Sequence, residues 1–273
     1  MAARDPHRFI NELDAATLAT LVERLEKRAQ IAIFSGLFDK YVDRLGLAPD
    51  ARVLEIGCGT GAMLRRLARR GDFSGAALGI DHSPMFIEAA RRFAREEGVD
   101  GQLSFQVGDA HCLDIPTAKY DAVVAHTLIS HVTDPAMVLS EMGCVLRPGG
   151  TMVVFDGDYA SMTYGYPDHG FGRQMDNALA VASFNNPRIM RDLPQLLPRL
   201  GLSIVEAWGD AVVEIGGSSY FRSFAETYAP CVSRANLLPP QAVEVWLKEQ
   251  RKAMDKGTFF AACIYYTYLV RRA

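Results

Sequence analysis

A short apolar run that ends in three closely spaced glycines constrains the fold of this chain more than any other feature. The run is V-L-E-I at residues 53–56, bounded by turn-forming residues, which is typical of a buried parallel strand. Gly57, Gly59 and Gly61 follow it, and without a Cβ they can adopt positive φ and let a ligand approach the backbone. The segment therefore predicts a strand, a tight loop, and a helix whose first N–H groups are free.

A second apolar run ends at Asp81, 20 residues after Gly61, where the next parallel strand should lie beside the first. A carboxylate at this point can accept hydrogen bonds from both hydroxyls of a ribose. The G-x-G-x-G spacing puts the last glycine one residue too early for the G-x-G-x-x-G pattern that binds a pyrophosphate, which disfavours a nicotinamide cofactor. A tight turn without a ligand is the structural alternative.

Strand and helix signals alternate from Arg52 to Asp156. Ser83-Pro84 and Asp134-Pro135 each place an N-cap residue before a proline at the first helical position. This alternation predicts right-handed crossovers and a parallel sheet with helices on both faces. A ligand site is then expected at the carboxyl ends of the strands.

Further segments follow in a consistent order: F-Q-V-G-D-A at 105–110, Y-D-A-V-V-A-H at 120–126 and V-L-R-P-G-G at 145–150. With the glycine loop, they make residues 51–156 resemble the small-molecule class I S-adenosylmethionine-dependent methyltransferases. The resemblance implies an α/β fold with a doubly wound, seven-stranded, mostly parallel sheet, and S-adenosylmethionine as the cofactor. It implies that the cofactor contacts are Glu55, Gly57, Cys58, Gly59, Gly61, Asp81, His82, Met85, Gly108, Asp109, Ala110 and His126.

Three parts of the chain are expected. Residues 1–48 would form an N-terminal helical segment that covers the active site, and residues 49–156 the cofactor-binding core. Residues 157–273 would complete the sheet and carry lid insertions at about 157–190 and 217–257, where substrate choice would lie.

Beyond Asp156 the pattern is weaker. Residues 157–190 show no sustained period, and Ile204 to Ile215 reads as extended chain interrupted at Gly209-Asp210. Cys263 to Val270 is rich in aromatic and β-branched residues and is the expected final strand, which similar folds insert antiparallel to its neighbours.

Methyl transfer needs an acceptor held in line, water excluded and, for some acceptors, a base. His131 follows the fourth strand and is the candidate base, since imidazole titrates near neutral pH; orienting its loop is the alternative. Asp156 and Asp158 are expected at the mouth of the pocket, with Asp158 in an electrostatic or hydrogen-bonding catalytic role, or in a structural turn. No third oxygen ligand is evident, so we expect no metal. Arg191 could meet an acid on the substrate or form an ion pair.

The composition limits the partners. A net charge of −3 creates no positive electrostatic field that would attract a polyanion. The basic run Arg65 to Arg70 fits a solvated helical face, so we do not expect nucleic acid as a partner. Five cysteines without metal-ligand spacing indicate reduced thiols in a cytoplasmic protein, with Cys58 as small filler. The sequence has no run of about 18 apolar residues that would span a membrane, and it leaves a homodimer open.

These features favour a methyltransferase that acts on an oxygen, nitrogen or carbon of a small, partly apolar metabolite, such as a quinone, a polyketide or another secondary metabolite. One alternative is a protein with the same fold that does not transfer methyl, either a binding module or a non-methylating enzyme. An NAD(P) oxidoreductase is the other alternative.

Overall fold

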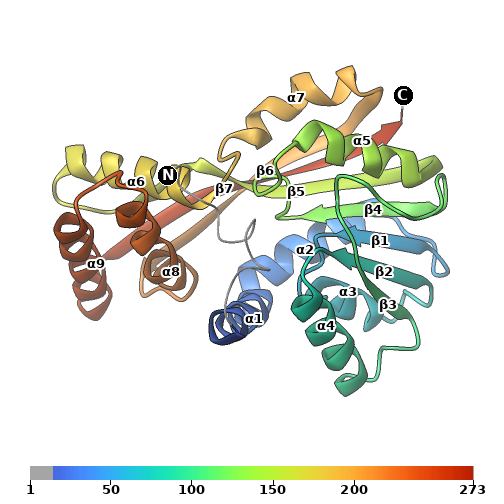
Figure 1. Ribbon diagram of the computed structural model, residues 1–273, viewed down its shortest axis with the longest axis horizontal. Coiled ribbons are helices and arrows are strands. Elements are labelled where there is room, and N and C mark those ends of the chain that lie inside the picture. Colours follow the sequence, from blue (N-terminus) through green and yellow to red (C-terminus); the bar gives the residue numbers. More distant parts are fainter. Residues whose placement is uncertain (1–14, 273) are drawn as a thin grey trace.

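A seven-stranded sheet forms the centre of the computed structural model, which describes residues 15–272 and, for residues 15 and 16, the backbone alone (Figure 1). The strand order is β3-β2-β1-β4-β5-β7-β6. Strand β7 is antiparallel to β5 and β6, and the other pairs are parallel. The expected doubly wound, mostly parallel sheet is confirmed. The strands are β1 (Arg52–Ile56), β2 (Ala76–Asp81), β3 (Leu103–Val107), β4 (Tyr120–His126), β5 (Leu146–Tyr164), β6 (Leu202–Gly216) and β7 (Phe259–Arg272).

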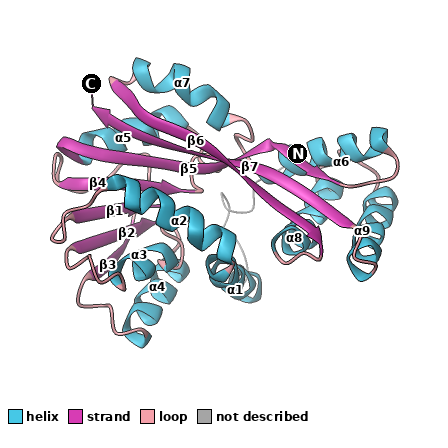
Figure 2. Ribbon diagram, turned by 180° about the vertical axis from the view of Figure 1, so that it is seen from behind, coloured by secondary structure: helices cyan, strands magenta, loops and turns pink. Residues whose placement is uncertain are grey.

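Helices pack on both faces of the sheet (Figure 2). One apolar cluster joins the sheet to α2, α3, α4, α6, α8 and α9, and a second joins the opposite face to α5 and α7. No helix among residues 15–272 is long and apolar enough to cross a bilayer. The helices are α1 (Ala15–Gln30), α2 (Ala32–Leu45), α3 (Ala62–Ala68), α4 (Pro84–Glu96), α5 (Pro135–Val145), α6 (His169–Ser183), α7 (Ile189–Arg199), α8 (Tyr220–Arg234) and α9 (Pro240–Asp255).

Strands β5, β6 and β7 are much longer than β1 to β4 and extend beyond them, with α6, α8 and α9 at their far end (Figures 1 and 2). The sequence places the end of the fifth strand at Asp156 and no regular element directly after it, which is wrong. Strand β5 continues to Tyr164 because β7 pairs with it there, across a register irregularity between Asp158 and Thr163. Pairing with a distant strand extends β5 where its own sequence carries no clear period.

The expected interruption of the next strand at Gly209 is also wrong, because β6 is continuous. Gly209 pairs with Tyr266 of β7, and a Cβ on Gly209 would lie 2.9 Å from a ring carbon of Tyr266. The glycine makes room for this ring instead of breaking the strand. The final strand is antiparallel as expected, and Cys263 to Val270 lies within β7.

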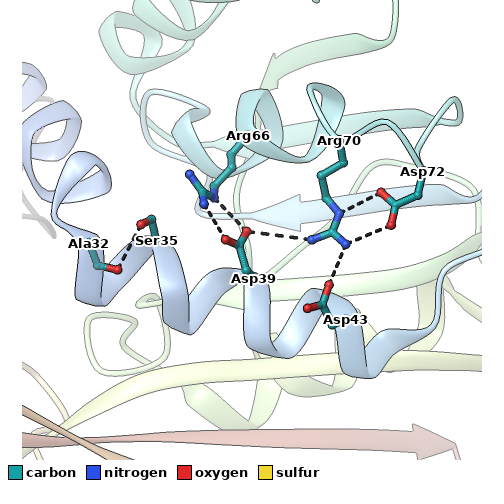
Figure 3. Close-up of polar contacts among 7 residues, drawn as sticks. All are labelled: Ala32, Ser35, Asp39, Asp43, Arg66, Arg70 and Asp72. Carbon is teal, nitrogen blue, oxygen red and sulfur yellow. Dashed lines mark hydrogen bonds and ion pairs between the residues drawn. The ribbon is translucent and has the colours of Figure 1, made fainter.

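Ion pairs fasten α2 to α3, the helix that follows the glycine loop (Figure 3). Arg66 Nε donates to Asp39 Oδ1 at 2.9 Å, and Arg70 Nη2 donates to Asp43 Oδ1 at 2.6 Å. Arg70 also pairs with Asp72. The two pairs with α2 are partly exposed, so each contributes at most about 1 kcal/mol. The basic run therefore faces carboxylates of a neighbouring helix as well as water.

Arg65, in the same basic run, contradicts the expected solvated face. Its side chain is only 3% exposed, and its guanidinium donates to Glu97 at 2.7 Å and to Glu26 of α1 at 2.6 Å. Two carboxylates, themselves partly exposed, thus compensate the buried positive charge of Arg65. Arg65 thereby holds α1 against α3, close to the glycine loop.

Candidate active site

A cavity of about 450 Å³ lies at the carboxyl ends of β1, β2 and β4, where α1 and α8 also contribute side chains. This is where ligands bind in open α/β sheets. Most of the residues expected from the sequence line this one cavity. They are Glu55, Gly57, Cys58, Gly59, Asp81, His82, Gly108, Asp109, Ala110, His126 and His131.

The glycine loop is held open by backbone hydrogen bonds. The N–H groups of Gly57 and Cys58 both donate to the carbonyl of Ile80, at 2.7 and 3.0 Å. Gly57 and Gly59 have φ of 70° and 52°, a region that residues with a Cβ rarely adopt. A Cβ on Gly57 would also lie 2.6 Å from a methyl carbon of Leu128. The loop therefore requires glycine for both conformation and space.

Gly61 and Met85, which were also expected to contact the cofactor, lie outside the residues that line the cavity. Gly61 has φ of 71° and begins α3, and a Cβ there would lie 2.5 Å from the ring of Phe105. Its glycine serves packing and backbone conformation. Met85 packs in a small apolar cluster between α1 and α4, and its neighbour Phe86 lines the cavity in its place.

Asp81 fixes the loop from the end of β2. Its Oδ2 accepts a hydrogen bond from the N–H of Gly59 and its Oδ1 accepts one from the N–H of Ser83, both at 2.9 Å. Burial raises the pKa of Asp81, and these two hydrogen bonds oppose that rise. Each carboxylate oxygen can accept a further hydrogen bond, so Asp81 can hold the loop and still receive donors from a ligand.

Glu55 presents a buried acceptor that the described residues do not satisfy. The residue is 3% exposed, lines the cavity, and its Oε2 has no hydrogen-bond partner among residues 15–272. Burial, and then the nearby Asp81, raise the pKa of Glu55 from 4.5 to about 8. An unsatisfied buried acceptor costs about 1–3 kcal/mol, so the site suits a ligand that brings a donor or a cation.

His111, which the sequence analysis did not single out, links the loop after β3 to the loop after β4. The backbone N–H of His111 donates to Asp109 Oδ1 at 2.9 Å, and its ring Nδ1 lies 2.7 Å from the same oxygen. His111 Nε2 lies 3.1 Å from the hydroxyl of Thr133. Hydrogen bonds from His111 lower the pKa of Asp109. No local motif marks His111, because its partners come from two different loops.

His126 lies at the end of β4 among aromatic rings. Its Nδ1 and the hydroxyl of Tyr41 are hydrogen-bonded at 2.9 Å, and its ring lies 4.6 Å from that of Phe155. Burial, and then the charge of Arg28, hold the pKa of His126 well below its usual value. The imidazole is therefore neutral, with its orientation fixed by Tyr41.

His131 lies on the cavity wall, with its ring centroid 5.0 Å from that of Phe184. Its backbone is fixed from both sides, because its N–H donates to the carbonyl of Leu128 and its carbonyl accepts from the side chain of Asn185. The structure thus brings the candidate base and the cofactor loop to the same cavity.

Asp156 and Asp158 do not lie at the mouth of the pocket, which corrects the expectation from the sequence. Both are fully buried and neither lines the cavity. Asp156 accepts from the backbone N–H of Ser130 at 2.9 Å, while Asp158 pairs with Arg191 at 2.7 Å. Asp156 therefore fixes the loop after β4, and Asp158 fixes α7 against β5. Among residues 15–272, no group of three His, Cys, Asp or Glu side chains could hold a metal ion.

The other half of the cavity is lined by aromatic rings and by two arginines of α1. Tyr159 and Phe184 stack with centroids 3.4 Å apart. Arg24 and Arg28 lie one helical turn apart, and sequence reasoning missed both of them. No local signal distinguishes them from other arginines, because Tyr228, the ring under Arg24, and Thr127, the hydrogen-bond partner of Arg28, come from distant segments.

The chain is similar to known methyltransferases in sequence. Residues 53–150 match the protein family described as a methyltransferase domain. An uncharacterized 37.1 kDa protein in transposon TN4556 of Streptomyces fradiae is 31% identical over 239 residues, which is 84% of this chain and 65% of that protein. The ubiquinone biosynthesis O-methyltransferase of Aeromonas salmonicida is 34% identical over 116 residues, which is 42% of this chain and 47% of that protein. The aligned segments thus span less than two thirds of these relatives.

A solved structure of geranyl diphosphate methyltransferase in complex with SAM shares the fold. It matches with a TM-score of 0.56 and 18% identity, covering 100% of this chain and 97% of that chain. At this identity, the likeness concerns the fold alone.

Proposed function

We propose that this chain is an S-adenosylmethionine-dependent methyltransferase that methylates an oxygen, nitrogen or carbon of a small, partly apolar metabolite. Residues 53–150, which match the family described as a methyltransferase domain, support this proposal. One observation carries the proposal: a single cavity joins the glycine loop and Asp81 to a half lined by aromatic rings. The ring-lined half supports an acceptor such as a quinone, a polyketide or another secondary metabolite. Segments 157–190 and 217–257, which supply several of these rings, would act as the lid.

The residues of the cofactor half fit the group. Gly57 and Gly59 would let it approach the loop backbone, and Asp81 would accept from its ribose hydroxyls. Glu55, with its unsatisfied Oε2, would accept from its ammonium group. The loop that holds Asp109 and its neighbours Gly108 and Ala110 would receive the adenine. When bound, the cofactor supplies an activated methyl group on a sulfonium, so the protein's task is to bind, orient and exclude water.

His131 has two candidate roles toward the acceptor. As a general base it would remove the acceptor proton; as a positioning residue it would orient the loop after β4. If it is the base, His131→Ala should lower kcat by roughly 10²- to 10⁴-fold and remove the pH dependence near neutrality, with cofactor affinity nearly intact. Normal turnover in this variant would assign the acceleration to positioning.

Transfer of a labelled methyl group tests the proposal. The chain is incubated with methyl-labelled S-adenosylmethionine and a panel of quinones, polyketides and phenols, and a reaction without the protein serves as the control for background transfer. Label should appear on at least one acceptor. Cofactor binding without any transfer would favour the non-methylating alternative. Thermal stabilisation by NAD or NADP, with none by S-adenosylhomocysteine, would favour an oxidoreductase.

We also propose that the protein acts in the cytoplasm on small molecules and not on nucleic acid. All five cysteines are free, which supports a reducing compartment. The net charge of −3 supports a small acceptor over a polyanion. Because the buried carboxylate of Asp158 is engaged by Arg191, we expect a chelator to leave methyl transfer unchanged.

A further inference from the structure

The charged residues of the cavity are divided between its two halves. The carboxylates that line it are Glu55, Asp81 and Asp109, all at the ends of β1 to β3. The arginines that line it, Arg24 and Arg28, both come from α1 and face rings of the other half. A ligand that fills the cavity therefore meets acceptors at one end and cations at the other.

Arg28 lies where the two halves meet. Its Nη2 donates to the hydroxyl of Thr127 at 2.9 Å, and its guanidinium carbon lies 5.1 Å from the ring centroid of Phe34. Thr127 directly follows β4 and has φ of 56°, a conformation that costs of order 1–3 kcal/mol for such a residue. This strained turn directs a neutral hydroxyl, not a carboxylate, at the guanidinium.

Arg24 lies one turn earlier on α1, over the ring of Tyr228 at 4.5 Å from its centroid. It is half-buried, and no carboxylate among residues 15–272 forms an ion pair with Arg24 or Arg28. Positive charge removed from water is stabilised by an anion that accepts several of the guanidinium N–H groups. The two guanidinium groups are thus available to bind anionic groups of a ligand.

The cofactor can supply only one such group. S-adenosylmethionine has a single carboxylate, and its other charged groups are cations. If Arg28, beside the end of β4, binds that carboxylate, Arg24 has no anionic partner among residues 15–272. The acceptor is then the ligand that can supply a second anion.

Several aromatic rings of this half of the cavity pack against one another beside Tyr228, the ring that Arg24 covers. Tyr159 and Phe184 stack at an interplanar angle of 9°, and Phe224 lies 6.0 Å from Phe184 at 16°. Tyr228 contacts Phe224 with centroids 4.6 Å apart. Where these rings line the cavity they form an aromatic wall, which suits a planar apolar molecule packed against it.

Resting on the proposed function, we propose that the acceptor is an aromatic or similarly planar carboxylic acid, and that Arg24 recognises its carboxylate. The planar body would lie among the rings of Tyr159, Phe184, Phe224 and Tyr228. The guanidinium matches a carboxylate through two parallel hydrogen bonds, so a neutral ester of the same molecule would bind more weakly.

Calorimetric binding to the full chain, saturated with S-adenosylhomocysteine, tests this. The probes are benzoate, 2-naphthoate and anthracene-2-carboxylate, each compared with its methyl ester. The variants are Arg24→Gln, Arg24→Lys and a control, Arg44→Gln, whose side chain is half exposed on α2 and pairs with Glu206. We expect at least one acid to bind tenfold or more tightly than its ester. Arg24→Gln should remove that preference, Arg24→Lys should retain part of it, and Arg44→Gln should leave it unchanged.

Equal affinity for acid and ester in the wild type would overturn the inference, as would no binding of any acid. An acid preference that survives in Arg24→Gln would overturn the role of Arg24. S-adenosylhomocysteine affinity, measured for each variant, shows whether the fold is intact. If the wild type does not bind S-adenosylhomocysteine, the proposed function fails, and the acid and ester comparison without it still decides the inference.

Discussion

Replacing Glu55 with glutamine should change how the stability of the protein without cofactor depends on pH. The carboxyl of Glu55 is buried, its Oε2 lacks a partner among the described residues, and its pKa is raised to about 8. Glutamine has nearly the same shape as glutamate and carries no charge at any pH used to study folding. The variant therefore removes the titration of this group and leaves the rest of the site in place.

The sign follows from the two pKa values. The folded protein keeps the Glu55 proton up to about pH 8, whereas the unfolded chain releases it near 4.5. The stabilisation is complete below about pH 4.5 and is lost as pH rises toward about 8. At ~1.4 kcal/mol per pKa unit the loss is at most about 5 kcal/mol, and because water can enter the cavity we expect about 2 to 5 kcal/mol.

Urea unfolding at about pH 5, 6.5 and 8 measures this effect. The free energy of unfolding of Glu55→Gln, relative to wild type, should rise by about 2 to 3.5 kcal/mol from pH 5 to pH 8, because this window covers only part of the full change. Glu88→Gln, on the exposed side of α4, is the matched control and should show no such trend. Other buried acids, such as Asp176, titrate in both proteins and cancel in the difference. A difference between variant and wild type that does not change with pH would refute the reasoning.

Three further perturbations test the site and its supports. Asp81→Ala should weaken S-adenosylhomocysteine binding by about 1 to 3 kcal/mol in calorimetry, because the loop and the ligand both lose an acceptor; unchanged affinity would exclude its ribose role. Gly61→Ala should lower the free energy of unfolding by more than Gly98→Ala does, since both have positive φ but only the first adds a Cβ against a ring; equal losses would show that backbone strain alone matters. Arg191→Met should destabilise the fold by about 1 to 3 kcal/mol in urea, because Asp158 would stay buried without its partner, and full stability would contradict that account.

Local rules account for the part of the site that the sequence predicted. Gly57 and Gly59 must adopt positive φ, which few other residues do, and Asp81 follows at the distance that one crossover requires. These requirements on backbone conformation and spacing can be recognised in the local sequence without knowledge of the rest of the fold. The order of strands and helices up to Asp156 follows from the same kind of signal.

Predictions failed where partners come from distant parts of the chain. Asp158 looked like a residue at the pocket mouth, yet β5 continues past it because β7 pairs there, and Arg191 of α7 takes its carboxylate. The role of Gly61 in making room for Phe105 of β3 was likewise not visible in its own segment, where the glycine spacing suggested only a cofactor contact. In each case the local pattern marked the residue as important, but its contact partner belongs to a segment distant in the sequence.

The sequence by itself determined the order of strands and helices up to Asp156 and the glycine loop, because periodicity, N-caps and glycine conformations act over a few residues. Only the tertiary structure decided the acceptor half. Arg24 lies near the beginning of the chain and Tyr228 near its end, and no periodicity relates them. Their contact arises because long antiparallel strands carry α8 to the cavity that α1 lines, so the substrate-facing surface exists only once these segments have packed together.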